Sequence, residues 1–241
     1  MYNFKGKTAI VTGATRGIGE AITIKLYNLG CNVIGIYKTR DDLANEIMKK
    51  YSNIKMIKAD VSKEDEVKKI VKASVNQFHK IDILINNVGI YIGGFIRNYS
   101  IENWREIVDV NLTSKFLMCK YCIPCLEKSK GAVIINISSR YGLDKYIEPL
   151  SIAYGITNAG INIFTYGLSK ELEKTGIRVN AVIPTVTDTD RFKNSFTREE
   201  QDYVKKKGKL GKAEEVADLV INLIKDKKAN RQIKIDKRVY L

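Results

Sequence analysis

Seven short apolar segments recur along the chain, and amphipathic stretches lie between them. The segments span residues 8–12, 32–37, 54–59, 81–86, 132–138, 178–183 and 232–236. Apolar residues at three- and four-residue steps predict helices within 67–78, 104–126, 153–174 and 214–225. Strands that alternate with helices favour a parallel sheet with helices on both faces. We therefore predict an α/β, doubly wound parallel sheet.

The first apolar segment runs directly into a glycine loop, Thr12-Gly13-Ala14-Thr15-Arg16-Gly17-Ile18-Gly19, and then into a predicted helix. Glycine permits positive φ and a close approach of the backbone to a ligand, and a helix N-terminus attracts anions. The spacing Gly-x3-Gly-x-Gly is also compatible with an ordinary strand–helix turn. The favoured interpretation is a pyrophosphate site.

The length of 241 residues is typical of one α/β domain, and we expect a single domain over residues 1–241. No apolar run reaches the roughly 18 residues of a membrane span, and no charged-then-apolar leader begins the chain. We therefore expect a cytoplasmic protein without membrane contacts. The net charge of +14 is spread over helix-like segments, which favours solvated helix faces and an anionic cofactor over nucleic acid.

Three of the four cysteines, Cys119, Cys122 and Cys125, have a spacing that resembles part of an iron–sulfur site. They lie on a predicted helix, however, and Cys31 is distant in sequence. We interpret all four as reduced packing residues and expect no metal.

The segments that follow the predicted strands carry candidate cofactor ligands. Lys38 follows the second strand, where an acidic residue would select NAD, and Arg16 lies in the glycine loop. Because cations suit a 2′-phosphate, we expect NADPH, although either side chain alone is compatible with a solvated surface charge. Asp60 after the third strand and Asn87 after the fourth can bind the adenosine or fasten the loops together.

At this point the chain resembles the short-chain dehydrogenase/reductase family, and the 3-oxoacyl-carrier-protein reductase branch most of all. The resemblance is carried by the glycine loop, Asp60-Val61, Asn86-Asn87-Val88-Gly89, Asn111, Ile137-Ser138-Ser139, Tyr154, Arg178-Val179-Asn180-Ala181-Val182-Ile183-Pro184 and Gly211-Lys212-Ala213-Glu214-Glu215-Val216-Ala217. It implies a Rossmann-like fold and hydride transfer between NADPH and a carbonyl or alcohol substrate.

The resemblance also implies roles for individual residues. Tyr154 is the expected acid/base, Ser139 binds the substrate oxygen and Asn111 holds a water of the proton relay. Ser138 is the alternative to Ser139, and only one of two adjacent strand residues can face the substrate. The expected cofactor-binding residues are Gly13, Thr15, Arg16, Gly17, Ile18, Gly19, Lys38, Asp60, Val61, Asn87, Gly89, Tyr154, Asn158, Pro184 and Thr187.

One departure from the family pattern concerns the lysine that normally lies four residues after the tyrosine, where this chain has Asn158. Tyr166 and Lys170 form a literal Tyr-x3-Lys, but this pair would lie too late in its helix and too close to Pro184. Asn158 can still bind the ribose and is retained as a catalytic candidate, although it supplies no positive charge. We therefore expect a weak enzyme or, alternatively, a non-catalytic NADPH-binding redox sensor or partner-binding module.

Further departures are Thr185 in place of the usual glycine, and the tail 236–241, which lacks the family's Gly-Gly. The inserted segment 144–150 and the loop 184–209 are expected to shape the substrate rim, with a mobile loop over 184–198. Two long apolar helices predict a homo-oligomer, and the family resemblance makes a tetramer the expected form. The apolar residues that support this prediction are Phe116, Met118, Ile161, Phe164 and Tyr166.

Overall fold

The computed structural model describes residues 2–195, 197–208, 210–236 and 238. Its strands form one seven-stranded parallel sheet in the order β3-β2-β1-β4-β5-β6-β7. The bounds are β1 Thr8–Thr12, β2 Asn32–Tyr37, β3 Ile54–Lys58, β4 Ile83–Asn86, β5 Val133–Ile137, β6 Arg178–Ile183 and β7 Ile233–Ile235. The doubly wound, Rossmann-like fold predicted from the sequence is confirmed, and the predicted strands lie within two residues of the observed bounds.

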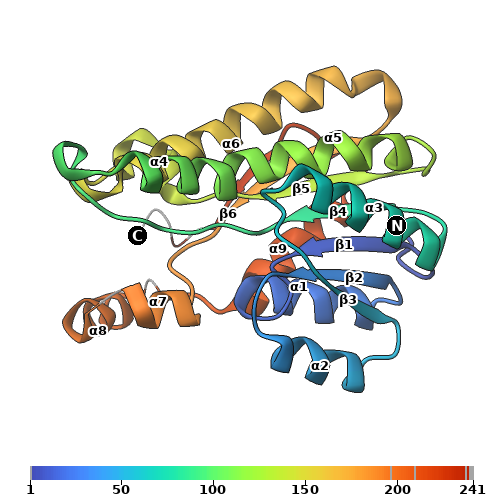
Figure 1. The fold of residues 1–241 in the computed structure, drawn as a ribbon, viewed down its shortest axis with the longest axis horizontal. Coiled ribbons are helices and arrows are strands. Elements are labelled where there is room, and N and C mark those ends of the chain that lie inside the picture. The colour runs from blue at the N-terminus through green and yellow to red at the C-terminus, as the bar shows by residue number, and fades with distance from the viewer. Residues whose placement is uncertain (1, 196, 209, 237, 239–241) are drawn as a thin grey trace.

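The sheet is buried on both faces because successive strand residues point to opposite sides. On β1, Ala9 and Val11 pack in the core beneath α1 (Gly17–Asn28), α2 (Asp41–Lys50) and α9 (Ala213–Lys225). Ile10, between them, packs against α3 (Glu64–Phe78), α5 (Ser114–Leu126) and α6 (Ile152–Glu171). Figure 1 shows the two helical layers with the sheet between them.

The predicted helix 104–126 is wrong as a single element. The structure has α4 (Ile101–Val108), a π-helical turn η2 (Asp109–Thr113) and then α5. Ser100 caps the N-terminus of α4, since its hydroxyl accepts the Asn103 N–H at 3.1 Å. A π turn shifts the backbone hydrogen bonds by one residue and is common at functional sites. Asn111 lies at the centre of this turn.

The predicted loop 184–198 is also wrong in part, because α7 (Asp190–Ser195) lies within it and α8 (Arg198–Lys206) follows. Thr197 and Glu200 form a capping box at the start of α8, a signal present in the sequence. Phe196, Lys209, Lys237 and residues 239–241 lie outside the described residues. The remaining elements are the 3₁₀ turns η1 (Ile96–Asn98), η3 (Arg140–Gly142), η4 (Asp144–Tyr146), η5 (Pro149–Ser151) and η6 (Glu173–Thr175). The inserted segment 144–150 thus contains η4 and the start of η5.

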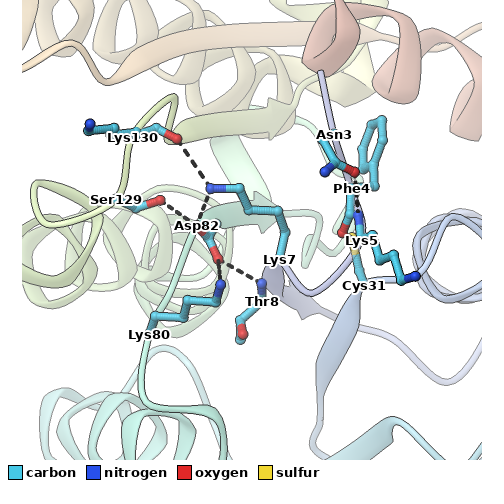
Figure 2. Close-up of polar contacts among 10 residues, drawn as sticks. All are labelled: Asn3, Phe4, Lys5, Lys7, Thr8, Cys31, Lys80, Asp82, Ser129 and Lys130. Atoms are coloured by element: carbon cyan, nitrogen blue, oxygen red, sulfur yellow. Dashed lines mark hydrogen bonds and ion pairs between the residues drawn. The ribbon is translucent and has the colours of Figure 1, made fainter. Parts of the chain in front are cut away.

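A buried carboxylate fastens the amino edge of the sheet (Figure 2). Asp82 precedes β4, is 1% exposed, and accepts the Thr8 N–H at 2.8 Å and the Lys7 ammonium at 2.7 Å. Ser129 donates to the same carboxylate, and Lys80 lies 3.8 Å from it. Burial alone would raise the pKa of Asp82, but the hydrogen bonds from Lys7 and Ser129 outweigh it and lower the pKa below its usual value. This cluster joins β1, β4 and the loop before β5.

The cysteines are core residues, as predicted. Cys31, Cys119 and Cys122 are buried, Cys125 is half-buried, and all four are free thiols. Burial raises the pKa of Cys119 to about 12, although a hydrogen bond from Asn86 opposes the shift. Within the described residues, no helix is both long and apolar enough to span a bilayer.

Candidate active site

The candidate site lies where the strand order reverses, between the carboxyl ends of β1 and β4. In an open parallel sheet this is the crevice in which ligands bind. Asn87, just after β4, joins the two strand ends: its backbone N–H donates to the Thr12 hydroxyl and its amide to the Thr12 carbonyl, both at 2.9 Å. The loop after β4 is thereby fixed against the glycine loop.

The glycine loop has the close backbone packing that the sequence predicts. Gly13 has φ +68° and Gly17 has φ +56°, which glycine adopts without strain. A Cβ on Gly19 would lie 2.0 Å from the Gly13 carbonyl oxygen, so only glycine fits there. Arg16 precedes α1 with no side-chain cap, and the first N–H groups of α1 face the loop without a capping side chain. These features suit an anionic group at the start of α1.

The chain after β6, within the predicted loop 184–198, covers this glycine loop. A Cβ on Gly17 would lie 3.0 Å from the Thr189 methyl group, so the chain after β6 passes directly over the glycine loop. Among the predicted residues of that chain, Pro184 is half-buried and Thr187 is buried. The Thr187 hydroxyl donates to the Thr185 carbonyl at 2.8 Å, and Thr187 forms a β-bridge with Gly211. The glycine loop is therefore bounded by two segments far apart in the sequence.

Two predicted cofactor residues, Lys38 and Asp60, form an ion pair at 2.8 Å across the ends of β2 and β3. Burial alone would raise the pKa of Asp60, but hydrogen bonds from Lys38 and Ser62 lower it below its usual value. The Lys38 side chain is 66% exposed, so its ammonium remains accessible from solvent. Arg16 is exposed, whereas Thr15 and Val61 are buried and Ile18 is half-buried.

Three of the four predicted catalytic residues line one small cavity of about 30 Å³, which is enough for a water molecule. These are Asn111 from the π turn and Tyr154 and Asn158 from α6. Ser139, the fourth, is not among the lining residues. The lining consists of Asn87, Val88, Gly89, Asn111, Lys115, Ile137, Ser138, Tyr154, Asn158 and Ile161.

Asn111 fastens three elements around the cavity. Its side-chain oxygen accepts the Ile90 N–H at 2.7 Å, and its amide donates to the Ile90 carbonyl at 2.9 Å and to the Thr157 hydroxyl at 3.2 Å. The π turn therefore holds the loop after β4 against α6. The Asn111 carbonyl accepts a hydrogen bond from the ammonium of Lys115 at 3.0 Å.

Tyr154 is half-buried between two other aromatic rings. The ring centroids of Tyr91 and Tyr141 lie 5.3 Å and 5.8 Å from its own, both in edge-to-face arrangement. Burial raises the pKa of both neighbouring phenols, which keeps them protonated at neutral pH. One turn along α6, the Asn158 amide donates to the Tyr154 carbonyl at 2.9 Å and so bonds the helix backbone.

The two adjacent serines have different environments. Ser138 is buried, lines the cavity, and its hydroxyl donates to the Asn158 carbonyl at 3.2 Å. Ser139 is half-exposed, and its hydroxyl accepts the Tyr141 N–H at 3.4 Å. The hydroxyl of Ser138 is thus engaged with α6, whereas that of Ser139 makes a long contact at the start of η3.

Lys115 is a further cavity residue, 2% exposed, that was not predicted from the sequence. Its ammonium donates to the Val88 carbonyl at 2.7 Å as well as to the Asn111 carbonyl. The available signal was its position four residues after Asn111, on a helix whose neighbouring positions Leu117, Met118 and Cys119 are apolar. A lysine within such a segment is read by default as a solvated side chain.

Known proteins share both the sequence pattern and the fold of this chain. The family model described as short chain dehydrogenase matches residues 7–200. An uncharacterized oxidoreductase of Staphylococcus aureus (strain MRSA252) is 33% identical over 186 residues, covering 76% of this chain and 79% of the relative. One of Staphylococcus epidermidis (strain RP62A) is 34% identical over 190 residues, covering 78% and 81%.

Solved structures extend the similarity to nearly the whole chain. A short chain dehydrogenase from Burkholderia cenocepacia J2315, solved in complex with NADP, has a TM-score of 0.90 at 26% identity and covers 97% of both chains. A short-chain dehydrogenase/reductase from Serratia marcescens BCRC 10948 also has a TM-score of 0.90 at 26% identity, covering 98% of both. The family match, the relatives and the shared fold agree, and this chain belongs to the short-chain dehydrogenase family of oxidoreductases.

Proposed function

We propose that this protein is an NADPH-dependent oxidoreductase that transfers a hydride between the nicotinamide and a carbonyl or alcohol substrate. The observation that carries the proposal is the single cavity shared by Tyr154, Asn111 and Asn158, beside a glycine loop that suits an anion. Membership of an oxidoreductase family and an NADP-bound structural neighbour support it.

The residues around the glycine loop fit the cofactor. Backbone N–H groups of the loop would hold the pyrophosphate, and the exposed cations of Arg16 and Lys38 would bind the 2′-phosphate. Lys38 would then exchange part of its contact with Asp60 for the phosphate. Asp60, Val61, Asn87 and Gly89 would contact the adenosine, Tyr154 and Asn158 the nicotinamide ribose, and Pro184 and Thr187 the nicotinamide.

The bound cofactor supplies the hydride, and the side chains of this chain handle the proton. In the reducing direction the Tyr154 hydroxyl donates its proton to the substrate oxygen, and Asn111 orients the relay water in the cavity. Ser139 hydrogen-bonds the same substrate oxygen. We assign this role to Ser139 because the Ser138 hydroxyl already donates to the Asn158 carbonyl.

The rim of the site supports an apolar carbonyl substrate, and we propose a 3-oxoacyl thioester. Exposed apolar side chains lie on the loop after β4 and on the inserted segment, and the Gly94 N–H joins the two segments through the Leu150 carbonyl at 2.9 Å. Burying such side chains against an acyl chain is favourable. The rim residues are Tyr91, Phe95, Ile96, Ile147 and Leu150.

We also propose a homotetramer and a reducing, cytoplasmic location. Phe116 and Tyr166 on α5 and α6 are 49% and 48% exposed, as an intermolecular contact requires. Met118 and Ile161 belong to the core instead, since each is 1% exposed, so the prediction that they support assembly is wrong. Light scattering at micromolar concentration tests the assembly, and a monomer contradicts it. The four free thiols are compatible with a reducing compartment.

A panel of ketones that includes an acetoacetyl thioester, followed by NADPH absorbance, tests the function. We expect turnover with the thioester and weaker turnover with small polar ketones, and loss of both in Tyr154→Phe. Tight NADPH binding by calorimetry without turnover of any ketone would instead support the binding-only alternative, which Asn158 favours because it lacks the charge of the family's lysine.

A further inference from the structure

The buried ammonium of Lys115 lies in the candidate site and has no role in the function as proposed so far. Lysine is almost never this buried unless its charge is satisfied, because removing an ammonium from water is costly. Here two backbone carbonyls, those of Val88 and Asn111, accept hydrogen bonds from it at 2.7 Å and 3.0 Å. The two acceptors come from the loop after β4 and from the π turn, so the ammonium is fixed from two sides.

The same cavity contains Tyr154 and Asn158. At position 158, where the family has its lysine, this chain has an amide that donates to the Tyr154 carbonyl. The cavity therefore retains a positive charge, but the charge comes from α5 instead of α6. In a site with little water, a cation near a phenol favours the phenolate over the neutral form.

We propose that Lys115 is a positioning residue that supplies the positive charge stabilising the Tyr154 phenolate in place of a lysine at position 158. The inference rests on the proposed reductase function. In reduction, the O–H bond of Tyr154 breaks, its proton forms the new O–H bond of the alcohol, and the phenolate left behind shares its cavity with Lys115, whose ammonium keeps its own proton. The wild-type enzyme then has a positive charge near Tyr154 although Asn158 supplies none. The loss of the family's lysine at position 158 is therefore no longer a reason to expect weak activity.

The alternative is purely structural: Lys115 only fastens the π turn to the loop after β4. Lys115→Gln separates the two roles, since glutamine keeps an N–H donor for the carbonyls and removes the charge. We expect kcat to fall on the order of a hundredfold, with KM and the NADPH dissociation constant changed less than about threefold. Lys120→Met is the matched control on the same helix, because Lys120 is exposed and pairs with Glu64 at 3.2 Å; it leaves kcat unchanged.

A charge transplant sharpens the test. Adding Asn158→Lys to Lys115→Gln restores at least a tenth of wild-type kcat if the site needs a cation near the phenol. Asn158→Lys alone gives no comparable gain in kcat, because Lys115 is still present and already supplies a cation. A structural role predicts the opposite pattern: lower unfolding free energy in Lys115→Gln, unchanged kcat in the folded fraction, and no rescue by the second substitution.

A titration of the protein without cofactor decides the inference even if no substrate is found. The tyrosinate absorbance of Tyr154, isolated by subtracting the Tyr154→Phe variant, should appear at higher pH in Lys115→Gln than in wild type. An identical titration in the two proteins would overturn the role of Lys115. If wild type reduces no carbonyl while the titration does shift, the proposed function fails and the electrostatic link between Lys115 and Tyr154 stands.

Discussion

An ionisable side chain is buried at the amino edge of the sheet and another at the carboxyl edge, but different groups satisfy the two charges. At the amino edge, the Asp82 carboxylate lies among the ammonium groups of Lys7 and Lys80 and the hydroxyl of Ser129 (Figure 2). At the carboxyl edge, two backbone carbonyls accept hydrogen bonds from the Lys115 ammonium. Asp82 is 1% exposed and Lys115 is 2% exposed, so burial alone does not distinguish them.

The two charges differ in the groups that lie near them. Asp82 is neutralised by nearby cations and joins the strands, so its contribution is to stability. The charge of Lys115 lies in a cavity together with Tyr154, a group that can lose a proton. In open parallel sheets, chemistry is concentrated at the carboxyl edge. The comparison predicts that substitutions at the carboxyl edge lower activity, whereas substitutions at the amino edge lower stability.

The largest effect is expected for Tyr154→Phe, which removes the proposed proton donor. We predict a fall in kcat of about 10²–10⁴-fold, the range of general acid–base catalysis, with an unchanged free energy of unfolding. Steady-state kinetics and chemical denaturation measure the two quantities. Tyr166→Phe is the control, because Tyr166 forms the literal Tyr-x3-Lys on the exposed side of α6; an equal loss there would refute the assignment.

Next in size is the substitution of Ser139. Ser139→Ala removes the proposed hydrogen bond to a substrate oxygen that gains charge, worth about 2 kcal/mol, or roughly thirtyfold in kcat/KM. Ser138→Ala is the matched variant, because the Ser138 hydroxyl donates to the backbone carbonyl of Asn158. If Ser138→Ala lowers kcat/KM more than Ser139→Ala does, the substrate oxygen is bound by Ser138 and not by Ser139.

At the amino edge, Asp82→Asn should lower the free energy of unfolding by about 2 kcal/mol and leave kcat unchanged. The pKa of Asp82 is lower in the folded protein than in the unfolded chain, so its stabilisation is present above about pH 4 and is lost as the pH falls below that. Denaturation at pH 7 and pH 3 should therefore show a smaller difference between variant and wild type at pH 3. Asp65→Asn, at an exposed carboxylate paired with Lys68, should have no measurable effect.

The smallest predicted effect concerns cofactor choice. Lys38→Ala should raise the NADPH dissociation constant about tenfold, since an exposed ammonium gives a modest contact with phosphate. The NADH dissociation constant should stay within about twofold. Calorimetric titration of both cofactors checks this, and equal losses for the two would show that Lys38 does not contact the 2′-phosphate.

The fold was predictable because strand and helix periodicities are local properties of the sequence. The bounds of β2 and β6 agree with the predicted ranges to the residue, whereas β7 is shorter than its predicted range. The π turn was missed because residues 104–126 keep a helical apolar pattern through it. Helix α7 was missed because it has only six residues, too few for a periodic signal.

The candidate site was only partly accessible from the sequence. The family resemblance identified Tyr154, Asn111 and Asn158, and the structure brings these three to one cavity. Lys115 and Thr189 were missed because their importance comes from contacts between distant segments, which periodicity does not encode. The Lys38–Asp60 pair was likewise hidden, since it joins the ends of two strands that become neighbours only in the sheet.

The central claim is hydride transfer at the carboxyl edge, and the fate of a labelled hydride tests it most directly. NADPH carrying two deuterium atoms at C4 of the nicotinamide is incubated with the acetoacetyl thioester, and the product is measured by mass spectrometry. Our account predicts one deuterium on the carbinol carbon of the alcohol, and none formed by Tyr154→Phe in the same time. Consumption of NADPH without deuterium in the alcohol, or equal labelling by Tyr154→Phe, would contradict it.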